Sequence, residues 1–263
     1  MVMPTFNKIQ CKVCGSRLTV REGKIKGIQR WKCKACGRKF LDNHARFHMK
    51  TPSDQVHAAI LLYYRGVSLN SIRQQLQQKH NYCPSVSTVY KWVVKYSHSA
   101  RELNRDYHPK VGDIWIIEET ALKICGQFIW IWDVIDEKTR FLLTSRVSLR
   151  HDADDAGVLM GQAFSRAGKT PALVIGGQLT PLLEGRYPFA VAESAGNNDF
   201  HNMFEWRTNM MSDLKRLDKV MEFVDGWVYY YNYFRPQEAM GGKTPSVAAS
   251  IRFVHKGDDL FKD

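Results

Sequence analysis

Three apolar runs in the second half of the chain set its fold class: IWIIEETALK (114–123), FIWIWDVID (128–136) and FLLTSRVS (141–148). Each run has the length and the apolar or alternating pattern of a β-strand, and Gly126 and the polar residues 136–138 mark the turns between them. The pattern that follows predicts, in order, a helix over 154–167, a strand over 172–175, a weaker strand over 188–193 and helices from 198. The second half of the chain is therefore predicted to be an α/β domain.

This order of elements is typical of an α/β core of ribonuclease H type, in which three antiparallel strands precede a crossover helix and further strands. A chain of 263 residues has room for such a core and for small additional modules. Its 44% hydrophobic and 24% charged residues exclude a disordered chain. No run of 18 apolar residues occurs and the first ten residues lack an apolar stretch, so we expect neither a membrane span nor a secretory signal.

Positive charge is concentrated toward the N-terminus. Residues 1–50 hold 13 Lys and Arg against 2 Asp and Glu, residues 51–110 hold 8 against 3, and residues 111–263 hold 17 against 21. The three net charges are +11, +5 and −4, which sum to the +12 of the chain. A gradient this steep favours a nucleic-acid-binding head over the alternative of a solvated basic surface.

Four of the six cysteines lie in two matching frames, CKVCG with Cys11 and Cys14, and CKACG with Cys33 and Cys36. A turn with this spacing places two thiolates about 3.5–4 Å apart, as a tetrahedral zinc ion requires. The interval between the frames is long enough for a hairpin, so the pattern predicts a structural zinc ribbon over residues 1–48. Two disulfides are the alternative, which is disfavoured because nothing in the sequence indicates an oxidising compartment.

Basic side chains surround the second cysteine pair and are predicted to contact DNA phosphates: Arg30, Lys32, Lys34, Arg38 and Lys39. Four thiolates and one Zn²⁺ sum to a charge of −2, so a zinc-bound head would keep a net charge of about +9. The head is therefore expected to remain strongly basic when zinc is bound.

Residues 51–97 carry the pattern of three short helices and are predicted to form a helix-turn-helix module. Ser68 can cap the second helix, and Pro84-Ser85 opens the third, whose buried stripe is predicted to be Val86, Val89, Trp92, Val93 and Tyr96. The outward side of the third helix is then predicted to contact DNA through Ser87, Thr88, Lys91 and Lys95. A plain three-helix bundle is the alternative.

The expected domains are a zinc ribbon (1–48), a helix-turn-helix module (51–97), a polar linker (98–110), a ribonuclease H-like domain (111–250) and a C-terminal tail (251–263). Two small DNA-binding modules in tandem raise each other's effective concentration at the DNA, so modest affinities combine.

The chain resembles the short DDE transposases of insertion sequences over nearly its whole length. The cysteine frames and STVYKWV (87–93) fit the front of that family, and GDIW (112–115) and WDVIDEKTRFLL (132–143) fit its first strands. The stretches YNYFRP (231–236) and GGKTP (241–245) resemble its C-terminal signature. The resemblance implies a zinc ribbon, a helix-turn-helix module and a ribonuclease H-like core.

In that family three carboxylates bind two Mg²⁺ ions, which activate a water or a 3′-hydroxyl for attack on DNA. The resemblance places the first carboxylate on Glu118, the second on Gly177 and the third on Glu205. Two positions depart from the family pattern, because Glu118 has one methylene more than the family's Asp and Gly177 offers no ligand. Other acidic residues are alternatives for the missing ligand: Asp133, Asp155, Glu184 and Glu193.

These observations predict a zinc-containing, sequence-specific DNA-binding protein of transposase ancestry with an incomplete catalytic site. Its expected partners are double-stranded DNA and a second copy of the chain, and we expect it to bind neither a membrane nor a small-molecule substrate. The expected location of the protein is the cytoplasm, in association with the nucleoid. The alternative is an active DDE transposase that catalyses DNA cleavage and strand transfer, and only this alternative requires Mg²⁺ as a cofactor. Whether the chain is an enzyme stays open at this point.

Overall fold

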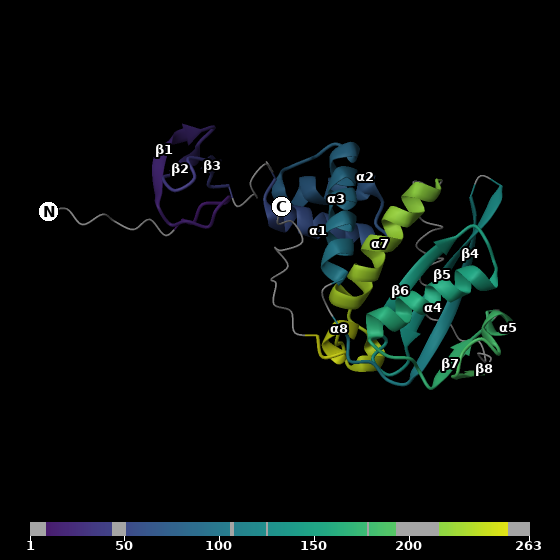
Figure 1. Cartoon of the computed structure of the whole chain (residues 1–263). Helices are drawn as coiled ribbons and strands as arrows, with labels where there is room; N and C mark the ends of the chain where they lie inside the picture. Colours follow the sequence, from purple (N-terminus) through teal and green to yellow (C-terminus); the bar gives the residue numbers. More distant parts are fainter. Residues whose placement is uncertain are drawn as a thin grey trace.

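The computed structural model describes residues 9–43, 51–105, 108–124, 126–177, 179–192 and 216–251. Figure 1 shows a small N-terminal body and a larger one in which a group of helices packs beside a β-sheet. Among the helices of the described ranges, none is long and apolar enough to cross a lipid bilayer.

The N-terminal body is an antiparallel sheet of three strands: β1 (Thr19–Ile25), β2 (Ile28–Cys33) and β3 (Lys39–Leu41). Lys26 and Gly27 join the first two strands, and their φ angles of 48° and 80° are those that a two-residue hairpin turn needs. Trp31 and Phe40 are buried with Cys11 and Cys33 in a small hydrophobic core of their own. The cysteines are therefore part of the core that holds this sheet together.

Three helices follow: α1 (Ser53–Tyr64), α2 (Leu69–His80) and α3 (Val86–Arg105). The Ser68 hydroxyl accepts a hydrogen bond from the Ser71 backbone N–H (3.2 Å) and caps α2. The Ser85 hydroxyl likewise accepts from the Thr88 N–H (3.1 Å) at the start of α3. Each of the three helices packs against the other two.

Two details of this region differ from the prediction. Val86, which was expected in the buried stripe, is 37% exposed because it is the first residue of α3 and lies beyond its packed turns. The predicted linker over 98–110 is helical as far as Arg105, and Ala100 is fully buried. Helix α3 continues through this stretch because it packs along α7 (Leu217–Phe234) near the end of the chain.

The larger body contains a five-stranded sheet: β4 (Ile114–Ile124), β5 (Gln127–Asp136), β6 (Leu142–Ser148), β7 (Leu173–Gly176) and β8 (Ala190–Ala192). The strand order is β6-β5-β4-β7-β8, with β4, β5 and β6 antiparallel and β7 and β8 parallel to β4. Helix α4 (Ala153–Ala167) crosses over between β6 and β7, and α5 (Thr180–Leu183) follows β7. This is the predicted mixed α/β sheet, with the order of a ribonuclease H-type core.

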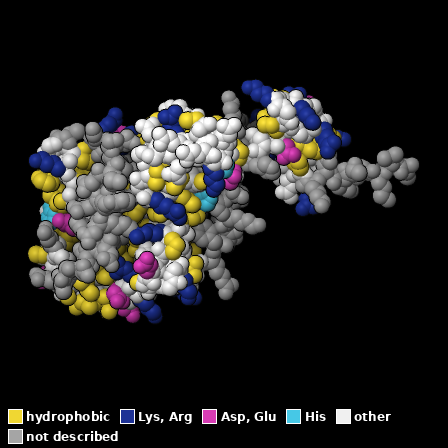
Figure 2. All heavy atoms as spheres, turned by 180° about the vertical axis from the view of Figure 1, so that it is seen from behind, with side chains coloured by type: hydrophobic (Ala, Val, Ile, Leu, Met, Phe, Trp, Pro, Cys, Tyr) yellow, Lys and Arg dark blue, Asp and Glu magenta, His cyan; other side chains and the backbone are white. Residues whose placement is uncertain are grey.

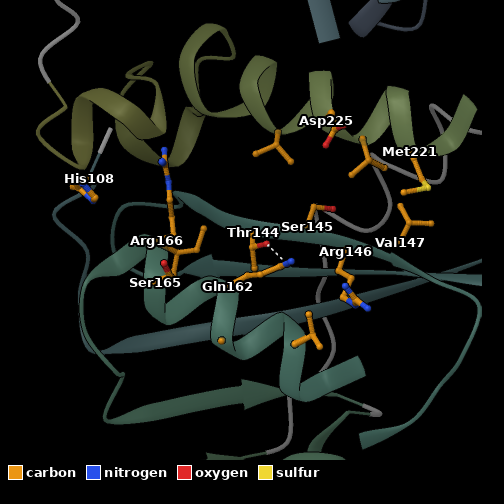
Figure 3. A pocket seen from close by; sticks show the side chains of 15 residues that line it. His108, Thr144, Ser145, Arg146, Val147, Gln162, Ser165, Arg166, Met221 and Asp225 are labelled. Carbon is orange, nitrogen blue, oxygen red and sulfur yellow. Dashed lines mark hydrogen bonds between the residues drawn. The ribbon is translucent and has the colours of Figure 1, made fainter. Parts of the chain in front are cut away.

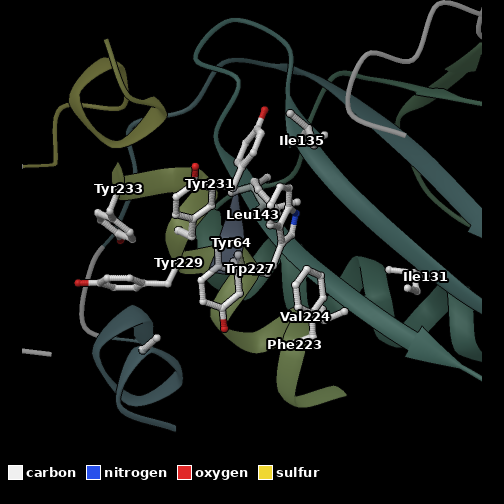
Figure 4. Packing of buried hydrophobic residues seen from close by; sticks show 14 of the residues in the cluster. Tyr64, Ile131, Ile135, Leu143, Phe223, Val224, Trp227, Tyr229, Tyr231 and Tyr233 are labelled. Carbon is white, nitrogen blue, oxygen red and sulfur yellow. The ribbon is translucent and has the colours of Figure 1, made fainter. Parts of the chain in front are cut away.

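Helix α7 lies between the N-terminal helices and the sheet (Figure 1). Its aromatic side chains pack in both directions: Tyr230 stacks on Tyr64 of α1 with ring centroids 5.6 Å apart, while Trp227 and Tyr231 are buried toward the sheet (Figure 4). The chain then forms a 3-10 turn (Glu238–Met240) and α8 (Pro245–Ala248), which packs on α7. The helices and the sheet therefore share one continuous hydrophobic core.

Candidate functional site

The four cysteines of the two frames converge on one point. The Sγ atoms of Cys11 and Cys36 lie 3.6 Å apart, as do those of Cys14 and Cys33, and all four lie within 4.8 Å of one another. Zn–S bonds of about 2.3 Å in a tetrahedron require sulfurs about 3.8 Å apart, so the set fits a zinc ion. Cys11 and Cys33 are buried and their partners are exposed, which leaves the site at the surface of the sheet.

Two equivalent turns build this cluster. The backbone N–H of Gly15 donates to the Cys11 carbonyl (2.9 Å), and that of Gly37 donates to the Cys33 carbonyl (3.0 Å). Both glycines have φ near +70°, a conformation that disfavours other residues. Each turn therefore brings its own pair of sulfurs together, independently of distant packing.

The cluster separates the pKa values of its thiols. Hydrogen bonds from the backbone N–H groups of Cys36 and Ala35 lower the pKa of Cys33 to about 6. The backbone of Ser16 forms a hydrogen bond that favours the Cys14 thiolate and lowers its pKa. Hydrogen bonds with the neighbouring thiols, above all that of Cys36, outweigh it and raise the pKa of Cys14 to about 12. Four negative sulfurs this close together need a cation between them, and a bound metal ion supplies one.

The basic residues of the N-terminal sheet that the sequence predicts for DNA contact differ in their surroundings, because some form salt bridges and others are exposed. Arg30 and Lys39 both form salt bridges to Glu22, at 3.3 and 2.7 Å, and Lys39 lowers the pKa of that carboxyl. Lys32, Lys34 and Arg38 are exposed. Figure 2 shows Lys and Arg side chains distributed over this body. The solvent face of the sheet is basic, but part of its charge is already balanced.

On α3, the predicted DNA-contacting residues lie in its first three turns. The hydroxyls of Ser87 and Thr88 both hydrogen-bond the Ser85 hydroxyl, at 2.9 and 2.8 Å, and so belong to the capping group of the helix. Lys91 and Lys95 are exposed one and two turns further along. The four residues thus form a continuous polar strip from the N-terminus of α3.

Gly177 lies directly after the end of β7, next to the strand that carries Glu118. The parallel pairing of Ile117 with Gly176 brings Gly177, the next residue, beside Glu118. Glu118 is buried at 3% exposure, and a Cβ on Gly177 would have no heavy atom within 4 Å beyond its chain neighbours. Within the described chain, Gly177, where the family resemblance predicts the second carboxylate, is therefore surrounded by open space. Glu205, the third position, lies outside the described residues, as does Glu193.

Asp133 lies directly opposite Glu118 across the β4–β5 ladder, so both carboxyl groups share one face. It is 1% exposed, and complete burial, reinforced by Glu118, raises its pKa to about 8. The Ser145 hydroxyl is near enough to favour the ionised form slightly, but neither Asp133 oxygen has a hydrogen-bond partner within the described chain. This raised pKa keeps Asp133 largely protonated near pH 7 as long as no cation is bound beside it.

Asp155, another of the acidic alternatives, does not reach this face. Asp155 is on α4, on the opposite side of the sheet, where it binds Ser148 and Arg146. The hydrogen bond from Ser148 lowers its pKa, and the guanidinium of Arg146 adds to the effect. Asp155 is therefore excluded as the alternative ligand beside Glu118. It binds β6 residues on the face of the sheet that carries Trp132, whereas Asp133 and Glu118 lie on the other face. Glu184 is exposed at the end of α5.

Glu118 and Asp133 lie on one face of the sheet, called the carboxylate face below. Helix α7 connects this face to the N-terminal helices. Burial raises the pKa of Tyr231 to about 12, with Glu118 among the charges near enough to contribute. On the other side of α7, a Cβ on Gly226 would overlap the Tyr64 hydroxyl and lie 2.7 Å from Ser97 Oγ. Sequence reasoning missed Gly226, although a glycine inside a long aromatic helix is a signal of close packing.

Asn232 is a second residue that sequence reasoning missed. It is fully buried, and its side-chain amide bonds the backbone of Leu142 in β6 twice, accepting from the N–H and donating to the carbonyl, both at 2.9 Å. These bonds fix α7 to the outer strand of the sheet. They give a structural role to the stretch YNYFRP.

No family model matches the sequence. An uncharacterized protein of Methanocaldococcus jannaschii, MJ0017, is 22% identical over 185 residues, which are 66% of this chain and 84% of that protein. The catalytic core domain of HTLV-2 integrase, solved in complex with magnesium, is similar at a TM-score of 0.40 and 16% identity over 54% of this chain and 97% of its own. The simian T-cell lymphotropic virus intasome, solved with a PP2A regulatory subunit, is similar at a TM-score of 0.46 and 12% identity over 78% and 74%.

Proposed function

We propose that the chain is a zinc-containing, sequence-specific DNA-binding protein derived from an insertion-sequence transposase, and that it does not perform strand transfer. The observation that carries this proposal is the open position at Gly177. There the ribonuclease H-like sheet has a buried glutamate, an empty space and a neutral aspartic acid where two Mg²⁺ ions would need several ionised oxygens.

The DNA-binding part of the proposal rests on the four-cysteine sheet and the helix α3. In this proposal the sheet is a zinc ribbon whose exposed Lys32, Lys34 and Arg38 contact phosphates, and α3 reads bases through its first turn. Because α1 and α3 pack on α7, the reading helix has a fixed orientation relative to the α/β sheet. A second copy of the chain would place two such helices on one duplex, as a homodimer does on a palindromic site.

One observation favours the second candidate, an active transposase. Asp133 brings a second carboxyl group directly opposite Glu118, and a strong cation can displace a proton from such a group. In this candidate function Glu118, Asp133 and Glu205 would hold Mg²⁺, which would activate the attacking oxygen. The raised pKa of Asp133 weighs against it, since deprotonation must accompany metal binding.

A selection from random duplexes with the zinc-loaded full chain tests the first part of the proposal. A recovered site should bind with an affinity that falls at least about tenfold between 50 and 200 mM salt. The same site, and the ends of the element that encodes the chain, are then incubated with Mg²⁺ or Mn²⁺. We expect no cleavage or joining. Cleavage that Glu205→Ala abolishes and Glu184→Ala leaves intact would establish the transposase instead.

A further inference from the structure

The outer edge of β6 is an open main-chain edge. The N–H of Asp136, on β5, donates a hydrogen bond to the carbonyl of Phe141, directly before the start of β6. In an antiparallel ladder every second residue of a strand directs its N–H and C=O groups toward the same neighbouring strand. Val134 and Trp132 therefore also direct these groups toward β6. Their partners on β6 point back toward β5. The residues between those partners, Ser145 and Val147, therefore direct their N–H and C=O groups away from the sheet.

One position along this edge already has a partner. Leu142 also faces outward, on the other side of the register shift in the β5–β6 ladder, and the amide of Asn232 pairs with both of its backbone groups. For Ser145 and Val147, the described ranges of the chain contain no strand or side chain in the equivalent place. Both residues are only half-buried. The edge is thus paired with Asn232 at one end and has two residues further along whose N–H and C=O groups face outward.

This open edge is the floor of a groove of about 800 Å³ between α4 and α7 (Figure 3). The α7 wall is mostly apolar and includes Met221, which is 50% exposed. The α4 wall is mostly polar, with Val158, 45% exposed, as its one apolar side chain among the described residues. Arg166 and Arg146 lie toward opposite ends of the groove (Figure 3). A shape of this kind fits one extended strand, whose main chain would pair with β6 and whose side chains would contact the two helices.

We propose that the occupant is the chain's own segment 252–263, RFVHKGDDLFKD, bound as a sixth strand. The described chain arrives next to the groove, because the N–H of Lys110 donates to the carbonyl of Ala249 (2.9 Å) and His108 lines the groove. Twelve residues reach about 40 Å when extended, more than the length of about 23 Å of the seven-residue β6.

The composition of the segment matches the groove. Phe253 and Val254 are strand-forming residues for the apolar part of its lining, and the carboxylates of Asp258 and Asp259 are complementary in charge to Arg166. Arg146, at the other end, already forms a salt bridge with Asp155. Attachment to the same chain makes the pairing intramolecular, so a few hydrogen bonds and apolar contacts suffice. Pairing would also close the only edge that β6 offers to strands of other molecules.

Residue-resolved hydrogen exchange in the full chain tests this proposal. The outward amides of Ser145 and Val147 should be protected in the wild type. They should exchange at least about tenfold faster in the double variant Phe253→Asp/Val254→Pro, which removes one apolar anchor and one hydrogen-bond donor. Adding the synthetic peptide 252–263 to that variant should restore the protection. Val158→Glu, which places a negative charge in the groove wall, should also accelerate exchange.

Two controls accompany this experiment. Amides of Thr144 and Arg146, which face β5, should keep their protection in every variant, which shows that the sheet remains folded. Val247→Glu, at a 58% exposed valine outside the groove, should change nothing. Protection that persists in the tail variant would assign the edge to another segment, and protection that rises with protein concentration would assign it to a second copy. Either result overturns the proposal.

Discussion

The four-cysteine cluster and the carboxylate face are two potential metal sites built in opposite ways. The cluster draws its ligands from two local turns, and all four sulfurs lie within 4.8 Å of one another. The carboxylate face draws its groups from separate strands, and its central position is a glycine. A site made from local turns is complete once its short motifs are present, whereas a site assembled across strands fails when one residue is changed.

The largest effect is expected from removing one ligand of the cluster. Cys33→Ser should reduce zinc from about one ion per chain to nearly none and unfold residues 9–43, because structural zinc supplies about 10–16 kcal/mol in small domains. Metal analysis measures the zinc content, and NMR of residues 9–43 measures the folding of the four-cysteine sheet. Cys83→Ser, at an exposed cysteine outside the cluster, is the control. Full zinc retention in Cys33→Ser would disprove the four-sulfur site.

The carboxylate face should make the free energy of unfolding depend on pH. Asp133 has a pKa near 8 in the folded chain and an ordinary one when unfolded, so between these values the unfolded state releases a proton that the folded state keeps. The stability of the wild type should therefore fall as pH rises from 5 to 8, by an amount on the order of a few kcal/mol.

Asp133→Asn should remove most of this fall, since an amide of the same shape does not ionise. Urea unfolding of both proteins at several pH values gives the comparison. Equal losses of stability with pH in the two proteins would mean that Asp133 is ionised in the fold and available as a ligand.

Helix α7 and the N-terminal helices are so close at Gly226 that an added methyl group should lower the stability of the chain. Gly226→Ala places a methyl group against Tyr64 and Ser97 and should destabilise the chain by about 1–3 kcal/mol. Gly161→Ala, in the middle of α4 with no atom within 4 Å of the new methyl, should instead stabilise it by about 0.5–1 kcal/mol. Thermal unfolding measures both. If the two variants behaved alike, the helices would not be fixed to α7.

The smallest effect concerns single DNA contacts. Lys91→Ala should weaken binding severalfold on every sequence and reduce the slope of log affinity against log salt by about one. Lys169→Ala, at a lysine paired with Asp113 in the α/β domain, should leave that slope unchanged. Changes at Ser87 should alter site preference instead. A slope that Lys91→Ala does not change would remove α3 from the DNA interface.

The sequence predicts the parts of this molecule whose determinants are local. The cysteine spacing predicts the cluster, and the three apolar runs predict β4, β5 and β6 within one or two residues. The sequence does not reveal what depends on register or on distant packing. Asp133 faces Glu118 only because of the β4–β5 register, and the stretch taken for a linker becomes helix because α7, more than 100 residues later, packs along it.

Binding of Mn²⁺ to the zinc-loaded chain, followed by electron paramagnetic resonance, probes the carboxylate face itself. The wild type should bind no Mn²⁺ there, whereas Glu118→Asp/Gly177→Asp should gain a site, because a side chain at 177 enters open space beside position 118. Two Mn²⁺ ions held about 4 Å apart by the unaltered wild type would show that the face still binds its metals and would contradict the account.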